Sequence, residues 1–104
     1  MQSDDMILIS IDDHMIEPAD MSDRHMPEKY RDQAPKFIHD PATGKGFWEF
    51  QGQQTGMSGL GAVASWPHEE WGMDPIGFPE MRPATYDAAL RVRDMDANGQ
   101  LAGM

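Results

Sequence analysis

Asp12 and His14 carry the side chains in this sequence whose types and spacing best suit chemistry. They stand two positions apart directly after the apolar run 6–11, and a period of two places alternate side chains on one side of an extended chain. A carboxylate and an imidazole are ligands that Zn²⁺ accepts. Glu17 follows three residues later, as a third ligand or an outer-shell acceptor. The spacing predicts a divalent metal site, and the alternative is that these polar residues simply end a strand in solvent.

The elements expected to position this pair form one βαβ unit of an α/β fold. Residues 6–11 are rich in Ile, which favours a strand buried on both faces of a parallel sheet. In such proteins sites are built at the carboxyl ends of strands, where the carboxylate and imidazole lie. Helical spacing marks residues 86–98, with Val92 on the apolar face and Gly99 at the terminating position. A second strand is expected to start at 100–104.

The insertion at 15–85 is expected to hold two short helices, a β-hairpin and a long lid-like loop. Its turn-forming residues and prolines set these boundaries, and the loop shows no lasting period of 2 or 3.6. The expected elements are a helix capped by Asp20 that runs through His25, a helix at 28–33, hairpin strands at 36–39 and 47–50, and the loop at 52–83.

Composition excludes several classes of function. The 104 residues carry a formal charge of −10, which repels phosphate backbones and anionic lipid headgroups, so nucleic acids and membranes are not expected partners. The sequence has no cysteine, which excludes disulfides, thiolate nucleophiles and iron–sulfur clusters. The apolar run 6–11 is too short for a signal-peptide core or a membrane span, and we expect a cytoplasmic protein.

Two further residues are weaker candidates for substrate binding. His68 lies in the expected loop and is a candidate for lining a substrate mouth, with surface packing as the alternative. Arg82 is a fork-shaped donor suited to a substrate carboxylate, with a structural pair to Asp or Glu as the alternative. His25 and His39 are expected to be structural or solvent-facing, and Asp94 is expected on the solvated face of the helix.

Residues 7–20, ILISIDDHMIEPAD, resemble the opening of the amidohydrolase-related proteins, in the amidohydrolase 2 branch that includes the aminocarboxymuconate-semialdehyde decarboxylase-like enzymes. The similarity continues through blocks at 27–35, 80–83, 86–87 and 91–99. The resemblance implies a metal-dependent (β/α)₈ TIM barrel, of which residues 1–104 are an N-terminal fragment. It also implies that Asp12 and His14 are the ligand pair of the first strand, with the remaining His and Asp on later strands.

The resemblance implies a metal-dependent hydrolase of a small substrate, with a decarboxylase of the same family as the alternative, because both share the first-strand ligands. Zinc is the expected metal and Mn²⁺ the alternative, since a carboxylate in the first position favours harder ions. The expected partners are a small-molecule substrate, the missing C-terminal barrel segments and a second copy of the full-length protein. From another class, the alternative is a small acidic module that binds a partner through exposed Trp, Met and Phe of residues 47–81.

Overall fold

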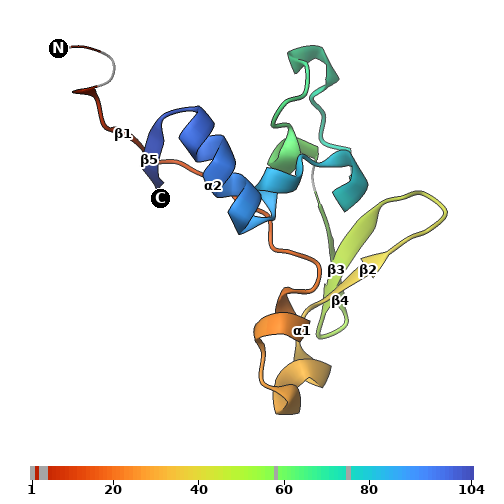
Figure 1. Ribbon diagram of the computed structural model, residues 1–104. Helices are drawn as coiled ribbons and strands as arrows, with labels where there is room; N and C mark the ends of the chain where they lie inside the picture. The colour runs from red at the N-terminus through yellow and green to blue at the C-terminus, as the bar shows by residue number, and fades with distance from the viewer. Residues whose placement is uncertain (1, 3–4, 58, 75) are drawn as a thin grey trace.

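The computed structural model describes residues 2, 5–57, 59–74 and 76–104. In this part of the chain the elements are mixed α and β, with two small sheets and no closed barrel (Figure 1). The chain measures 55 × 38 × 19 Å and its radius of gyration is 16.5 Å. A compact domain of this length has a radius of gyration of about 13 Å. The segments therefore extend as separate arms from a small centre.

The helices and strands are short, and connecting segments separate them. Among the described residues, no helix has the length and apolarity that a membrane span needs. The strands are β1 (Leu8–Ser10), β2 (Lys36–His39), β3 (Gly46–Phe50), β4 (Gln53–Gly56) and β5 (Gln100–Gly103). The α-helices are α1 (Met21–His25) and α2 (Ala88–Ala97), and the 3₁₀ helices are η2 (Glu28–Gln33), η3 (Gly59–Ala62), η4 (His68–Glu70), η5 (Phe78–Glu80) and η6 (Pro83–Thr85).

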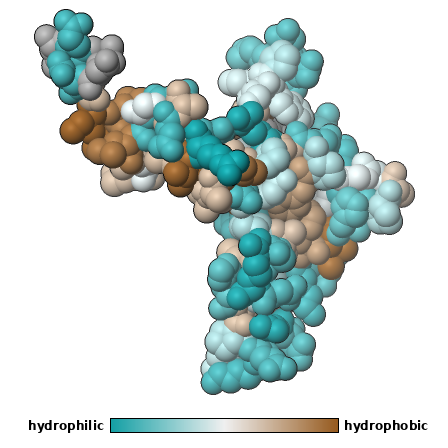
Figure 2. Space-filling view, in the orientation of Figure 1, coloured by the Kyte–Doolittle hydropathy of each residue, from teal (hydrophilic) through white to brown (hydrophobic). Residues whose placement is uncertain are grey.

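The strands β1 and β5 form a parallel pair, which confirms the expected strand–insertion–helix–strand order. Ile9 pairs with Ala102 and Ser10 with Gly103, and β1 is shorter than the run 6–11 that predicted it. The expected burial of this strand is wrong within this chain, because Leu8 and Ile9 are each 52% exposed, and Ile7 and Ile11, which flank β1, are 70% and 79% exposed. One helix and two strands cannot cover both faces of a parallel sheet. The apolar surface over β1 and β5 is visible in Figure 2.

The helix α2 begins and ends close to the expected boundaries. The Asp87 side chain accepts a hydrogen bond from the Leu90 backbone N–H at 2.9 Å, and Gly99 follows the helix with a φ of 67°. An aspartate that caps the first turn and a glycine with positive φ after the last turn are the signals that begin and end a helix. Its apolar face differs from the expectation, because Val92 is 55% exposed and no α2 residue is buried. The helix therefore gains little from hydrophobic burial.

The insertion contains a three-stranded antiparallel sheet in the order β2–β3–β4. The expected hairpin is confirmed by β2 and β3, in which Phe37 pairs with Trp48. The strand β4 lies within the expected loop and was not predicted. A two-residue turn joins it to β3, with φ values of 51° at Gln51 and 76° at Gly52. Positive φ at both positions gives the backbone twist that a tight hairpin needs.

The two expected short helices are α1 and η2, which form the arm at the bottom of Figure 1. Asp20 precedes α1, but its side chain makes no capping hydrogen bond. The Asp20 carboxylate instead accepts a 2.6 Å hydrogen bond from Arg24 Nη2, one turn further on. That ion pair also lowers the pKa of Asp20. The expected capping role of Asp20 is therefore wrong, and its charge supports the helix through a side-chain pair.

The small core lies between the three-stranded sheet and the 3₁₀ segments. Met57, Ile76 and Met81 are its buried members. The Phe78 ring meets the Phe37 ring edge-on at 4.8 Å between centroids. The half-buried residues packed on the core are Ile16, Phe37, Trp48, Trp66, Phe78 and Tyr86. Of the residues that the interaction-module hypothesis expects at the surface, Met57 and Met81 are buried, which corrects that expectation for them. Phe50, Trp71 and Met73 are exposed, as the hypothesis expects.

Candidate functional site

The side chains of Asp12 and His14 converge just beyond the carboxyl end of β1. His14 Nε2 lies 3.0 Å from Asp12 Oδ1, and the side chains are 82% exposed for His14 and 87% for Asp12. Two ligands bound to one tetrahedral zinc ion at about 2.0–2.2 Å lie about 3.4 Å from each other. The two atoms are at hydrogen-bond distance, and a small increase in their separation would bring them to adjacent positions in one coordination shell. The exposure leaves their outer side open to further ligands.

Backbone hydrogen bonds hold the segment that carries this pair on both sides. The Asp13 N–H donates to the Met104 carbonyl at 2.8 Å, which extends the pairing of β1 with β5. The Ile16 N–H donates to the Thr85 carbonyl at 2.8 Å, and the Ile16 side chain packs on the core. His14 lies between these two anchors. Its backbone is therefore more constrained than the exposure of its side chain indicates.

Asp13 turns away from its two neighbours and into the contact between α2 and β5. Its carboxylate lies 3.1 Å from Arg91 Nη2 and accepts a 2.8 Å hydrogen bond from Gln100 Nε2. A hydrogen bond from the Ser10 side chain, together with Gln100 and Arg91, holds the pKa of Asp13 below its ordinary value. Sequence reasoning missed this residue, because both long-range partners are remote in sequence and no local pattern indicates them.

Glu17 does not join the candidate pair. It lines a surface pocket of about 250 Å³ with Met21, Pro35 and Trp48. Within residues 2, 5–57, 59–74 and 76–104, no group of three or more His, Cys, Asp or Glu side chains is arranged to hold a metal ion. The described part of the chain thus supplies two close donor atoms, and it does not assemble the expected third.

His68 lies on η4 and contacts an aromatic ring. The centroids of the His68 and Trp71 rings are 4.6 Å apart, and the rings are tilted by 47°. The Trp71 indole N–H donates to the Trp66 carbonyl at 3.2 Å, which closes this loop on itself. These contacts match the surface-packing alternative for His68. The ring contact of His68 with Trp71 does not place His68 at the mouth of a substrate pocket.

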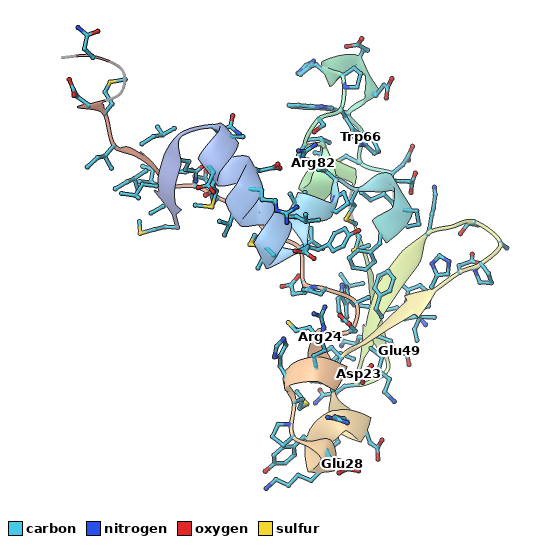
Figure 3. The ribbon with its side chains drawn as sticks, in the orientation of Figure 1. Asp23, Arg24, Glu28, Glu49, Trp66 and Arg82 are labelled. Carbon is cyan, nitrogen blue, oxygen red and sulfur yellow. The ribbon has the colours of Figure 1, made fainter. Side chains whose placement is uncertain are left out.

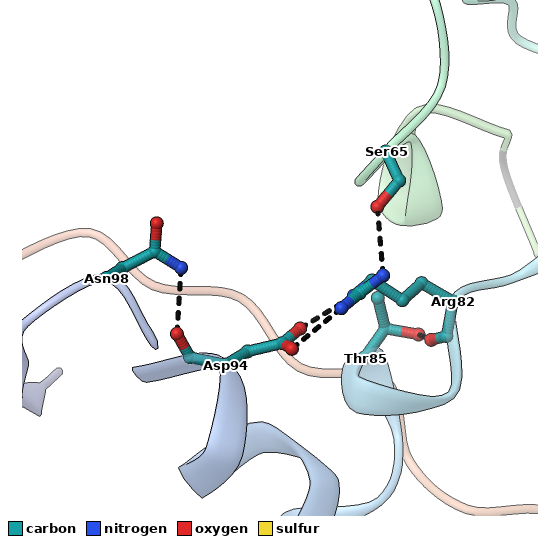
Figure 4. A network of polar contacts seen from close by, with 5 residues as sticks. All are labelled: Ser65, Arg82, Thr85, Asp94 and Asn98. Atoms are coloured by element: carbon teal, nitrogen blue, oxygen red, sulfur yellow. Dashed lines mark hydrogen bonds and ion pairs between the residues drawn. The ribbon is translucent and has the colours of Figure 1, made fainter. Parts of the chain in front are cut away.

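Arg82 forms the structural ion pair that was the alternative to substrate binding. Its guanidinium donates to both carboxylate oxygens of Asp94, at 2.6 and 2.7 Å, and to Ser65 Oγ at 3.3 Å (Figure 4). This pairing raises the pKa of Arg82 and lowers that of Asp94. Asp94 was expected on a solvated face, and the structure corrects this, because it fastens α2 to the segment before η6. Each of the three guanidinium nitrogens of Arg82 thus donates one hydrogen bond within the protein.

A larger pocket lies between α1 and the start of α2, beside the backbone that follows His14. Its volume is about 520 Å³. Arg24 and Asp20 form their ion pair at its wall, so the pocket carries both signs of charge. Figure 3 labels Arg24, which lies on α1. The lining residues are Met15, Pro18, Asp20, Arg24, His25, Tyr86, Asp87, Ala88 and Ala89.

The sequence matches no protein-family model and no curated protein. The geometry around Asp12 and His14 is therefore the evidence on which a functional proposal has to stand.

Proposed function

We propose that this chain is the N-terminal part of a metal-dependent hydrolase of the amidohydrolase-related type, with Asp12 and His14 as its contribution to the metal centre. The observation that carries the proposal is the 3.0 Å approach of His14 Nε2 to Asp12 Oδ1. It occurs directly after a strand of a parallel pair, the place where α/β enzymes build their sites. The reaction class is cleavage of a C–N or C–O bond in a small substrate.

The donor set fits a divalent cation with one nitrogen and one oxygen ligand from this chain. Zn²⁺ is the first choice and Mn²⁺ the second, because the carboxylate shifts the preference toward harder ions. When bound, such an ion supplies Lewis acidity toward a substrate oxygen. To ligate it through Nε2, His14 must present a lone pair there, so its remaining proton has to lie on Nδ1. Asp12 would supply the oxygen ligand through its carboxylate, which in this structure is at hydrogen-bond distance from His14 Nε2.

The exposed strands support the barrel architecture that the proposal requires. Ile7, Ile11 and Leu101 are 70%, 79% and 69% exposed, although such side chains are usually buried. A (β/α)₈ barrel covers one face of each strand with helices and fills the other with side chains. The pocket of about 520 Å³ that Met15 lines has room for a small molecule, and its lining residues do not include Asp12 or His14.

The same pair serves the alternative chemistry within the proposed class. A decarboxylase would use the same first-strand ligands. The alternative from another class is the interaction module, for which Phe50, Trp71 and Met73 are exposed, whereas Met57 and Met81 lie in the core. A reading frame that continues past Met104 into further βα units with His and Asp at strand ends would favour the enzyme. A stop codon directly after Met104 would favour the module.

Titration of the ¹⁵N-labelled chain with Zn²⁺, followed by NMR, tests the proposal directly. We expect weak binding, because catalytic zinc sites use three protein ligands and this chain brings two together. The shifts should centre on residues 12–14 and vanish in His14→Ala. The matched control is His39→Ala, which removes an exposed histidine on β2 and should leave these shifts intact. Binding that persists in His14→Ala, or that centres on other residues, would overturn the proposal.

A further inference from the structure

We propose that the pocket beside Trp48 binds a small organic cation, with the Glu17 carboxylate as the charged partner of that cation. The pocket has a volume of about 250 Å³, and its lining residues are Glu17, Met21, Pro35 and Trp48. Three of these side chains are apolar and the fourth is a carboxylate. The lining does not include the donor pair of the proposed metal centre, so this site is independent of that function.

The Glu17 carboxylate is free to take a charged partner. Glu17 is exposed, and within residues 2, 5–57, 59–74 and 76–104 its side chain has no hydrogen-bond or ion-pair partner. Asp13, Asp20 and Asp94 differ from it, because each is paired with an arginine. A carboxylate beside apolar side chains attracts a cation more strongly than one in open water, since the effective dielectric constant is lower. The net charge of −10 adds to this attraction.

Trp48 supplies the aromatic part of the lining. Its register on β3 places it opposite Phe37, and the two rings meet edge-on at 5.4 Å between centroids. Lys36 and Glu49 form the next pair along, and they lie on the other face of the sheet because alternate side chains point to opposite faces. In the described part of the chain, no Lys or Arg side chain stacks on the Trp48 ring. The indole, which is the strongest cation–π partner among side chains, therefore has no cation of its own.

The lining suits an organic cation better than a metal ion. A metal ion needs several oxygen or nitrogen ligands, and the pocket offers one carboxylate. A quaternary ammonium group spreads its charge over methyl groups, which can contact apolar side chains while the charge faces a carboxylate and an aromatic ring. Pockets for drug-sized ligands have volumes of about 300–1,000 Å³, so this smaller pocket suits a molecule of a few carbon atoms.

The surroundings of the pocket favour a free small molecule over a basic peptide. A neighbouring surface pocket shares Pro35, and its lining includes Arg31 and Lys36 together with Asp23. A peptide that carried several cations along this surface would meet two like charges there, which disfavours its binding. A single small cation beside Glu17 avoids that repulsion.

The test compares choline with its uncharged isostere dimethylbutanol, in which a carbon atom replaces the quaternary nitrogen. The two probes share a shape and differ in charge. Each is titrated into the ¹⁵N-labelled full chain at constant ionic strength, and the Trp48 indole N–H signal is followed by NMR. Glu17→Gln removes the charge of the carboxylate. The matched control is Glu28→Gln, which makes the same change at an exposed glutamate of η2 that is labelled in Figure 3.

We expect choline to shift the Trp48 indole signal with a roughly millimolar dissociation constant, and the isostere to bind about tenfold more weakly. Glu17→Gln should weaken choline binding about threefold and leave binding of the isostere unchanged. Glu28→Gln should change neither. Equal binding of the two probes, or no shift of the Trp48 signal at millimolar choline, would overturn the proposal. Equal effects of the two variants on choline binding would also overturn it, because net charge alone would then explain the binding.

Discussion

Arg82 and Asp94 are joined by two parallel hydrogen bonds, from Nε to Oδ2 at 2.6 Å and from Nη2 to Oδ1 at 2.7 Å. This fork-to-fork geometry is the strongest form of a side-chain ion pair. It joins α2 to the segment before η6, and Ser65 adds a bond from the neighbouring loop. Since α2 buries no residue of its own, this pair is a principal attachment of the helix.

Arg82→Ala should therefore loosen α2 and lower the thermal midpoint by a few degrees. Arg82→Lys should recover only part of the loss, because an ammonium group cannot make the two parallel bonds. Circular dichroism melts of the two variants check this. Arg93→Ala, which removes an exposed arginine on α2 itself, is the control and should melt like the unsubstituted chain. Equal midpoints for Arg82→Ala and Arg93→Ala would contradict the assigned role.

Acid should remove the same contribution. The hydrogen bonds and charge of Arg82 hold the pKa of Asp94 below its ordinary value of 3.8. A carboxyl group whose pKa is lower in the folded state stabilises that state above the unfolded pKa, and loses this effect as the pH falls through the folded pKa. We expect the midpoint temperature of thermal unfolding to decrease as the pH is lowered beyond about 4. The fall should be shallower in Arg82→Ala, and identical acid limbs in both proteins would refute the link.

The turn between β3 and β4 is a place where a substitution should stabilise the chain. Gln51 has a φ of 51°, which is costly for a residue with a long side chain. Gln51→Asn or Gln51→Gly should raise the free energy of unfolding by about 0.5–1 kcal/mol, because these residues suit the first position of such a turn. Urea denaturation measures the change. Gln54→Asn, on the following strand, is the control and should not stabilise.

The exposed β1–β5 surface should make the isolated chain associate. Apolar side chains beside unpaired strand edges favour contact between copies. We expect the purified chain to associate through this surface as its concentration rises, with a sedimentation coefficient that increases with concentration, and to be aggregated or partly ordered at the highest concentrations. Ile9→Lys with Leu101→Lys should lower the sedimentation coefficient while the signals of the three-stranded sheet persist. A concentration-independent monomer with one sharp thermal transition would contradict this expectation.

Features that depend on neighbouring residues could be predicted from the sequence. The boundaries of α2 follow from Asp87 and Gly99, and the β2–β3 hairpin follows from the turn formers between two apolar segments. The strand β4 escaped prediction because its residues are polar and because Gln51 is an unusual choice for a left-handed turn position.

The convergence of Asp12 and His14 is also local, because it follows from their spacing, and the structure confirms it. Features that depend on long-range pairing could not be predicted from local patterns. The attachment of Asp13 to Gln100 joins opposite ends of the chain, so no local period contains it. The burial of β1 failed as a prediction because apolar composition indicates what a strand prefers, whereas the neighbouring elements decide what covers it.

The pairing of β1 with β5 has a consequence for the order of folding. Leu8 and Gln100 pair across almost the entire chain, whereas the β2, β3 and β4 pairings span short turns. Each doubling of a loop adds about 0.6 kcal/mol to the entropy cost of closing it, and distant contacts form more slowly than local ones. Residues 12–14 take their places only when the two ends of the chain meet. The candidate site should therefore gain protection from hydrogen exchange later than the hairpins during refolding.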